Sequence, residues 1–149
     1  MESRIDIAIK KFSEGHNCAQ AVAVTYAPLF GVSEQEVLRT ATAFGAGMGR
    51  LQSVCGALTG AFMVAGFKEG MMVPGDKESK ERTYALVQAM GKAFEQQHGK
   101  LTCRELLGCD MNTDEGMKQY HEQGLNAAVC KECVRTAAAL VEKMVFEAK

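Results

Sequence analysis

The sequence has no excess of charge of either sign. Its 149 residues include 17 basic and 18 acidic side chains, mixed along the chain, and the formal net charge is -1. Proteins that bind nucleic acid or anionic lipid concentrate basic side chains on one surface. The composition therefore predicts no nucleic-acid partner and no electrostatic attachment to a membrane.

The chain also lacks long apolar segments of the kind that enter membranes. Its longest nearly uncharged apolar run covers residues 57–67, whereas a helix that spans a bilayer needs about 20 residues. Residues 1–12 alternate charged and apolar side chains and contain no stretch typical of a signal peptide. We therefore expect no membrane insertion and a cytoplasmic location.

Strand signals and backbone breakers are scarce. The sequence contains two prolines, Pro28 and Pro74, and its apolar residues recur at helical spacing without strand-like alternation. A chain of 149 residues with 47% hydrophobic content can bury one sizeable core. We predict an all-α fold, a single-domain compact bundle of about six to eight helices over residues 1–149.

Capping residues predict where the helices begin. Ser33 with Glu36 and Thr102 with Glu105 form capping boxes, in which two residues satisfy backbone N–H groups of the first turn. A long amphipathic helix is predicted over residues 77–98, and the predicted helix over residues 37–44 runs into the glycine-rich sequence G-A-G-M-G. The other predicted helix starts, apart from a short first helix that ends at Gly15, are at Asn17, Ser53, Thr113 and Asn126.

Four of the six cysteines follow these predicted caps. In a reducing cytosol, cysteines serve in catalysis or metal binding more often than in disulfides. The N–H groups and the dipole of a helix start stabilise a thiolate, which is the form that attacks disulfides and binds metals. The sequence therefore predicts a shared site with sulfur chemistry, made by Cys18, Cys55, Cys103 and Cys130.

Each cysteine also has a structural interpretation, because free cysteine is often buried as a small hydrophobic residue. We assign this role to Cys109 and Cys133. Cys130 and Cys133 form a C-x-x-C sequence, but they do so within a helical pattern and without the strand that precedes this motif in redox folds.

Two polar residues near these cysteines each fit two roles. His16 is either a base or ligand beside Cys18 or an exposed loop residue. Arg50 either lowers the pKa of the Cys55 thiol or binds a carboxylate of a helix.

Gly56 and Gly60 stand in the first turns of the helix that follows Cys55. A glycine inside a helix costs about 1 kcal/mol relative to alanine, so both positions require an explanation. We predict that Gly56 leaves room beside the sulfur and that Gly60, one turn later, lets a helix or a cofactor approach closely. The alternative is tight helix packing through small residues alone.

The order of the cysteine motifs resembles a known family. Cys18 is followed by C-G-A-L-T-G at residues 55–60, by C-R-E-L-L-G at residues 103–108 and by Cys130 in C-K-E-C-V-R. This order resembles the family of redox-active proteins named for their C-GCAxxG-C-C pattern. By position, the resemblance places the four cysteines of the family at Cys18, Cys55, Cys103 and Cys130.

The resemblance carries further expectations. Members of this family are small helical bacterial proteins, often encoded near oxidoreductases or transporters, which are therefore the expected partners. A similar helical arrangement in the iron-sulfur part of split-Soret haem proteins implies an iron-sulfur cluster as a candidate cofactor. Covalent haem attachment is not expected, because the sequence contains no C-x-x-C-H.

Three functional hypotheses follow for the chain. In the first, Cys55 attacks a disulfide of a partner, and one of Cys18, Cys103 or Cys130 resolves the mixed disulfide. In the second, these same thiolates bind a metal or an iron-sulfur cluster. In the third, the chain is a structural helical module with buried thiols. The first two require the cysteines to meet in one pocket, near Gly56 and the G-A-G-M-G loop.

Overall fold

A computed structural model describes residues 1–147 and confirms the all-α fold. Within this range the chain forms no strand, and its only β-type pairing is an isolated bridge between Val54 and Thr102. The elements are α1 (Ile5–Ser13), α2 (Cys18–Tyr26), η1 (Ala27–Phe30), α3 (Glu34–Thr42), α4 (Gly45–Met48), α5 (Gly56–Glu69), α6 (Lys77–His98), α7 (Cys103–Leu107), α8 (Asp114–Glu122), η2 (Asn126–Cys130), α9 (Lys131–Val141) and η3 (Glu142–Glu147).

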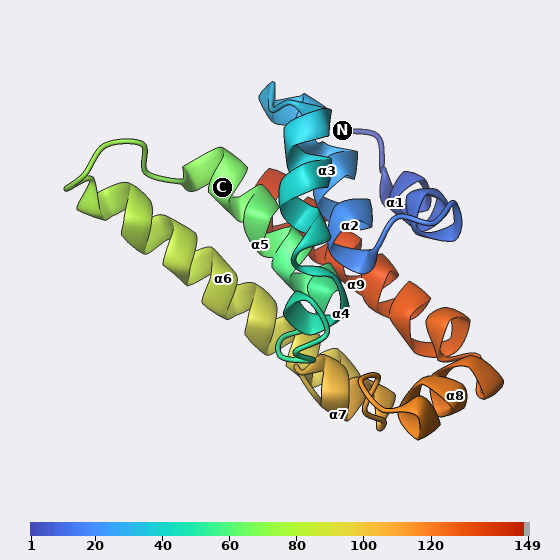
Figure 1. Ribbon diagram of the computed structural model, residues 1–149. Helices are drawn as coiled ribbons and strands as arrows, with labels where there is room; N and C mark the ends of the chain where they lie inside the picture. The colour runs from blue at the N-terminus through green and yellow to red at the C-terminus, as the bar shows by residue number, and fades with distance from the viewer. Residues whose placement is uncertain (148–149) are drawn as a thin grey trace.

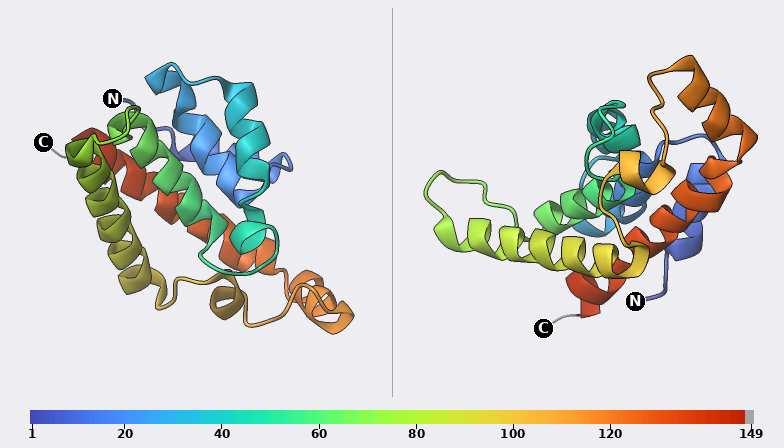
Figure 2. Two further views of the ribbon diagram at one scale, coloured as in Figure 1. Left: turned by 60° about the vertical axis from the view of Figure 1, so that its left-hand side comes forward. Right: turned by 90° about the horizontal axis from the view of Figure 1, so that it is seen from below.

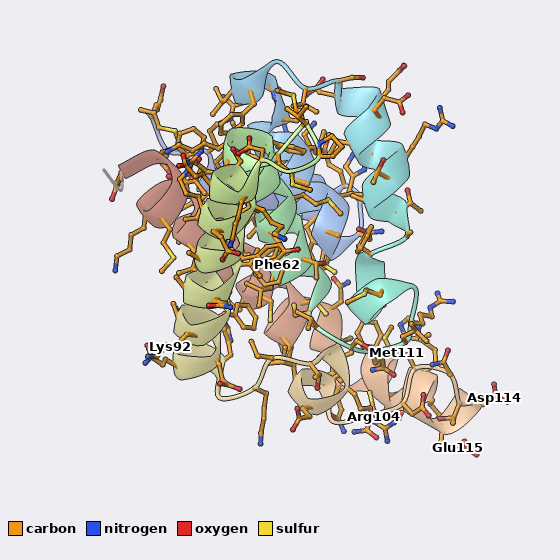
Figure 3. The ribbon with its side chains drawn as sticks, turned by 90° about the vertical axis from the view of Figure 1, so that its left-hand side faces the viewer. Phe62, Lys92, Arg104, Met111, Asp114 and Glu115 are labelled. Atoms are coloured by element: carbon orange, nitrogen blue, oxygen red, sulfur yellow. The ribbon has the colours of Figure 1, made fainter. Side chains whose placement is uncertain are left out.

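Helix α5 forms the centre of the bundle. It contacts α2, α6 and α9 (Figure 1), and its buried residues occupy more than one face. A helix that is apolar on most sides is stable only when other helices surround it. In Figure 3, Phe62 of α5 lies toward α6, whereas Lys92 of α6 points outward. No helix within residues 1–147 is both long enough and apolar enough to span a membrane.

Gly60 brings α2 and α5 into close contact. A Cβ atom at this position would lie 2.7 Å from the carbonyl oxygen of Ala19 and 3.1 Å from Cβ of Val22. We predicted that either a helix or a cofactor approaches Gly60, and in the structure helix α2 does so. Gly60 does not line the cavity described below, and its contact with a cofactor stays a prediction.

Most of the predicted caps are present. Asn17 and Gln20 form a reciprocal capping box at α2, and the hydroxyl groups of Ser33, Thr102 and Thr113 accept backbone N–H groups at α3, α7 and α8. The predicted bounds of α6 are confirmed. Helix α3 ends at Thr42, before the predicted residue 44.

The predicted cap at Ser53 is wrong, because this segment is extended. The backbone N–H of Cys55 donates to Leu101 O at 2.9 Å, and that of Cys103 donates to Ser53 O at 2.7 Å. These bonds hold the chain straight through Ser53. Helix α5 therefore starts later, with Cys55 as its N-cap residue.

The last helix starts at Asn126, as predicted, although the Asn126 side chain does not cap it. The π-helical segment η2 passes directly into α9, and the N–H of Lys131 donates to Asn126 O. Cys130 thus lies inside a continuous helix. π-Helical turns are rare and are frequent at functional sites.

The G-A-G-M-G sequence forms a tight left-handed turn. Residues 46–50 all have positive φ angles, between 54° and 70°. This conformation costs roughly 1–2 kcal/mol for each residue that carries a side chain. At Gly47 a Cβ atom would lie 2.8 Å from Cβ of Cys103, so glycine here lets the turn pack against α7.

The short elements gather at one end of the bundle. Figure 1 shows α4, α7 and α8 near the start of α5, whereas the loop from α5 to α6 lies at the opposite end. Figure 2 shows the same grouping from two other directions. The predicted cysteine site lies at the end with the short elements.

Candidate functional site

A cavity of about 260 Å³ lies at this end of the bundle and is lined by five of the six cysteines. We call it the thiol cavity. Its other lining residues include Ala46 of the left-handed turn and Gly56. The expectation that the cysteines of the predicted site would share one pocket near these glycines agrees with this arrangement. The lining cysteines are Cys18, Cys55, Cys103, Cys130 and Cys133.

Backbone pairing places Cys55 beside Cys103. The isolated bridge between Val54 and Thr102 aligns the two chain segments in antiparallel fashion, and the N–H groups of Cys55 and Cys103 each donate across it. Both cysteines then lie at the first positions of a helix. Because this bridge joins segments remote in sequence, no local pattern predicts it.

Gly56 brings Cys18 against the start of α5. A Cβ atom at position 56 would collide with Sγ of Cys18 and would lie 2.8 Å from Phe44 O. The prediction that Gly56 leaves room for a sulfur is confirmed, although the sulfur is that of Cys18 and not that of the adjacent Cys55.

Burial raises the pKa of the cavity thiols. Burial, together with the charge on neighbouring thiols, raises the pKa of Cys18 to about 11 and the pKa values of Cys103 and Cys130 to about 12. Hydrogen bonding to the Cys133 thiol and burial raise the pKa of Cys55 well above its ordinary value. In the metal-free protein these thiols are therefore protonated at neutral pH.

The expectation of thiolates stabilised by helix starts is thus wrong for the metal-free protein. The predicted donors are present: the N–H groups of Ala19 and Ala46 lower the pKa of Cys18, and those of Ala57 and Leu58 lower the pKa of Cys55. Loss of hydration outweighs these donors at Cys18, and the hydrogen bond to Cys133 together with loss of hydration outweighs them at Cys55.

Two polar side chains contact the remaining thiols. Nε2 of Gln52 lies 3.8 Å from Sγ of Cys103, and the hydroxyl group of Tyr120 lies 3.8 Å from Sγ of Cys130. Sequence analysis missed both residues. Glutamine and tyrosine at isolated positions belong to no recognisable motif, so the sequence contains no signal for them.

Cys133 is the functional candidate that the sequence analysis set aside. It is 1% exposed, lines the thiol cavity and interacts with the Cys55 thiol. The C-x-x-C spacing from Cys130 was the available signal. Cys109 is also buried, but it does not line the cavity, and its carbonyl oxygen accepts a hydrogen bond from Gln52.

Of the two polar residues predicted near the cysteines, only His16 lines the thiol cavity. His16 lines the thiol cavity, whereas Arg50 lines a separate surface depression, and its carbonyl oxygen accepts from Asn112 at 2.7 Å. In the described part of the chain, no lysine, arginine, aspartate or glutamate lines the thiol cavity. In Figure 3, Asp114 and Glu115 lie at the outer end of α8.

The thiol positions do not suit a single metal ion. Within residues 1–147, no three Cys, His, Asp or Glu side chains converge on one ion position, as zinc requires with Zn–S distances of about 2.3 Å. An iron-sulfur cluster distributes its cysteine ligands over several iron atoms. Separate thiols around a cavity that Gly56 also lines fit such a cluster better than one ion.

The comparisons with known proteins add one match. A family model described as "Putative redox-active protein (C_GCAxxG_C_C)" matches residues 16–144. No curated protein and no solved structure matches the chain. The matched region includes all the cysteines that line the thiol cavity. Because the match covers most of the sequence, the chain belongs to the C_GCAxxG_C_C family.

Proposed function

We propose that the thiol cavity holds an iron-sulfur cluster and that the protein transfers single electrons. Cys18, Cys55, Cys103 and Cys130 are the proposed ligands. The observation that carries the proposal is the convergence of these thiols on a cavity that has hydrogen-bond donors for sulfur but no cationic side chain among its lining residues.

Charge balance supports a metal-containing group. Thiolates in a buried site repel one another, and each needs compensation when it loses hydration. Since neither lysine nor arginine lines the described cavity, the protein supplies only N–H and O–H dipoles. Iron ions would supply the missing positive charge.

The raised pKa values fit the same proposal. A metal-bound thiol is deprotonated outright, so binding must displace the thiol protons. The pKa values of about 11 and 12 keep these protons in place in the metal-free protein at neutral pH. Loading should therefore release protons and should weaken as the pH falls.

The chain itself orients and shields the group. When bound, an iron-sulfur cluster accepts and releases one electron at a time. Cys55 and Cys103 are buried, whereas Cys18 and Cys130 are partly exposed. The electron donor and acceptor would approach on the side of these two partly exposed cysteines. We expect the electron donor and the electron acceptor to be oxidoreductases with a flavin or an iron-sulfur centre. One of them could be an oxidoreductase linked to a transporter.

Anaerobic reconstitution tests the proposal. The reduced protein is incubated with ferrous iron and sulfide, desalted, and analysed by visible and electron paramagnetic resonance spectroscopy and for iron and acid-labile sulfide. We expect a bound cluster that is lost or altered when Cys18, Cys55, Cys103 or Cys130 is changed to serine. Cys109→Ser is the matched control, because Cys109 is buried outside the cavity lining. The proposal would be refuted if the wild-type protein retained no iron or sulfide after reconstitution and desalting.

A second candidate function rests on the contact between Cys55 and Cys133. In this function a Cys55 thiolate attacks a disulfide of a partner protein, and one partner sulfur leaves as a thiolate and takes up a proton. Cys133 then loses its proton and attacks Cys55 in the mixed disulfide, which releases the second partner thiolate. The Cys55–Cys133 pair is oxidised, and the partner gains two electrons and two protons.

The raised pKa of Cys55 disfavours this exchange at neutral pH, because the thiolate is the attacking form. The Cys133→Ser variant separates the two functions. Dithiol exchange with an oxidised model disulfide would be lost in this variant, whereas a cluster held by the other cysteines would remain.

A further inference from the structure

Gln52 is held with its amide NH2 group toward Cys103. Its Oε1 accepts from the backbone N–H of Met111 at 2.8 Å, and its Nε2 donates to Cys109 O at 3.0 Å. The reversed amide would place a donor against a donor and an acceptor against an acceptor. The two backbone partners therefore fix the orientation, and the second hydrogen of Nε2 is left for Sγ of Cys103, 3.8 Å away.

This orientation is rigid. Gln52 is 5% exposed and has a φ angle of 55°. Its backbone N–H donates to Ala46 O, and its own carbonyl oxygen accepts from Arg104. The backbone of Gln52 thus joins the left-handed turn to α7, and its side chain cannot turn away from the thiol without breaking its hydrogen bonds to Cys109 and Met111.

Tyr120 is arranged in a similar way toward Cys130. Nδ2 of Asn126 donates to the Tyr120 hydroxyl oxygen at 3.0 Å, and the same hydroxyl lies 3.8 Å from Sγ of Cys130. An amide NH2 group can only donate, so the hydroxyl hydrogen is free to point to sulfur. Asn126 therefore positions Tyr120 as a donor to Cys130.

We infer that Gln52 and Tyr120 are positioning residues that donate hydrogen bonds to the thiolates of Cys103 and Cys130 and raise the reduction potential of the cluster. This inference rests on the proposed function. Hydrogen bonds to cysteine sulfur stabilise negative charge on it, and the reduced cluster carries one more negative charge than the oxidised cluster. The donors therefore favour the reduced state.

The four proposed ligands differ in the kind of hydrogen-bond donor that their sulfur atoms accept from. Cys18 and Cys55 accept from backbone N–H groups, which substitutions leave in place. Cys103 and Cys130 depend on neutral side chains. Because both donors are uncharged, they tune the potential without adding charge to the cavity. Substitution of residue 52 or residue 120 should therefore change the potential by removing a hydrogen bond to sulfur.

The test compares the midpoint potentials of reconstituted variants. Gln52→Met keeps the length of the side chain and removes the donor without adding a charge, and Tyr120→Phe removes only the hydroxyl group. We expect each to lower the preference for the reduced state about three- to tenfold, which is roughly 28–59 mV for a one-electron couple. Gln88→Met and Tyr84→Phe are matched controls at exposed positions of α6, and they should leave the potential unchanged.

A second readout distinguishes a hydrogen bond from a general structural effect. The Fe–S(Cys) stretching bands in resonance Raman spectra should shift in the two site variants and, in wild-type protein, on transfer to D2O. If Gln52→Met fails to fold, Tyr120→Phe alone decides the inference. A loaded wild-type protein whose potential is unaffected by Tyr120→Phe would overturn this inference but not the proposed function. A wild-type protein that binds no cluster would overturn both.

Discussion

Gly56 and Cys18 occupy adjoining space at the start of α5, where the Cys18 sulfur fills the volume that a side chain at position 56 would need. Glycine at this position is therefore a requirement of the cavity and not only of the helix. This relationship links the C-G-A-x-x-G sequence directly to a second cysteine, one that lies far from it along the chain.

Gly56→Ala should lower the stability of the protein and disturb the site. The new Cβ would meet Sγ of Cys18 and Phe44 O, so one of them must move. Such overpacking typically costs about 1–3 kcal/mol. Urea unfolding and the iron content after reconstitution measure the two effects. Gly66→Ala is the matched control in the same helix, because nothing lies within 4 Å of its added Cβ. This control should gain up to about 1 kcal/mol.

Gly60→Ala should lower stability without changing the site. Its Cβ would lie 2.7 Å from Ala19 O at the contact between α2 and α5, so the helices must separate, at a cost of about 1–3 kcal/mol. The iron content of the folded fraction should equal that of the parent. A folded variant with a normal melting temperature but no cluster would show that Gly60 contacts the cofactor after all.

The stability of the metal-free protein should fall as the pH rises above 9. The folded state raises the pKa values of Cys18, Cys103 and Cys130 from 9.0 to about 11 or 12, so the unfolded chain loses these protons first. The contribution of each thiol is therefore fully present below pH 9 and is lost as the pH approaches its folded pKa. Urea unfolding at several pH values, under reducing and metal-free conditions, measures this slope.

The Cys103→Ser variant provides the control for this slope, because serine does not titrate in this range. Its stability should decline less steeply between pH 9 and pH 11 than that of the parent. An identical slope in the two proteins would mean that the folded state does not shift the Cys103 pKa.

Cys109 and Cys133 should both be dispensable for cluster binding. Neither is a proposed ligand, although Cys133 lines the cavity and Cys109 does not. We expect the Cys109→Ser, Cys133→Ser double variant to retain the iron and sulfide content of the parent. Loss of the cluster in Cys133→Ser alone would make Cys133 a ligand in place of one of the other cysteines.

Local signals in the sequence predict much of the fold. The caps at Asn17, Ser33, Thr102 and Thr113 and the bounds of α6 agree with the structure, because each depends on side chains within a few residues. Gly56 was also predictable, since a glycine in the first turn of a helix is costly unless something approaches it.

The errors in the prediction arise from contacts between distant segments. Ser53 resembles a cap, but hydrogen bonds with residues 101–103 keep it extended. Asn126 resembles a cap and does begin the last helix, but its side chain donates to Tyr120 instead of capping the first turn. The thiols were expected to ionise readily, and the expectation failed because burial depends on the complete fold. Gln52 and Tyr120 act only through tertiary contacts, which no sequence spacing reveals.

The thiol cavity draws its proposed ligands from α2, from the starts of α5 and α7, and from η2. During synthesis, therefore, the site does not exist until η2 and α9 have left the ribosome and α9 has packed against α5. A cluster would have to be delivered to this site after that point. Once bound, it would tie α2 to η2, so its removal should loosen the contacts between these distant segments.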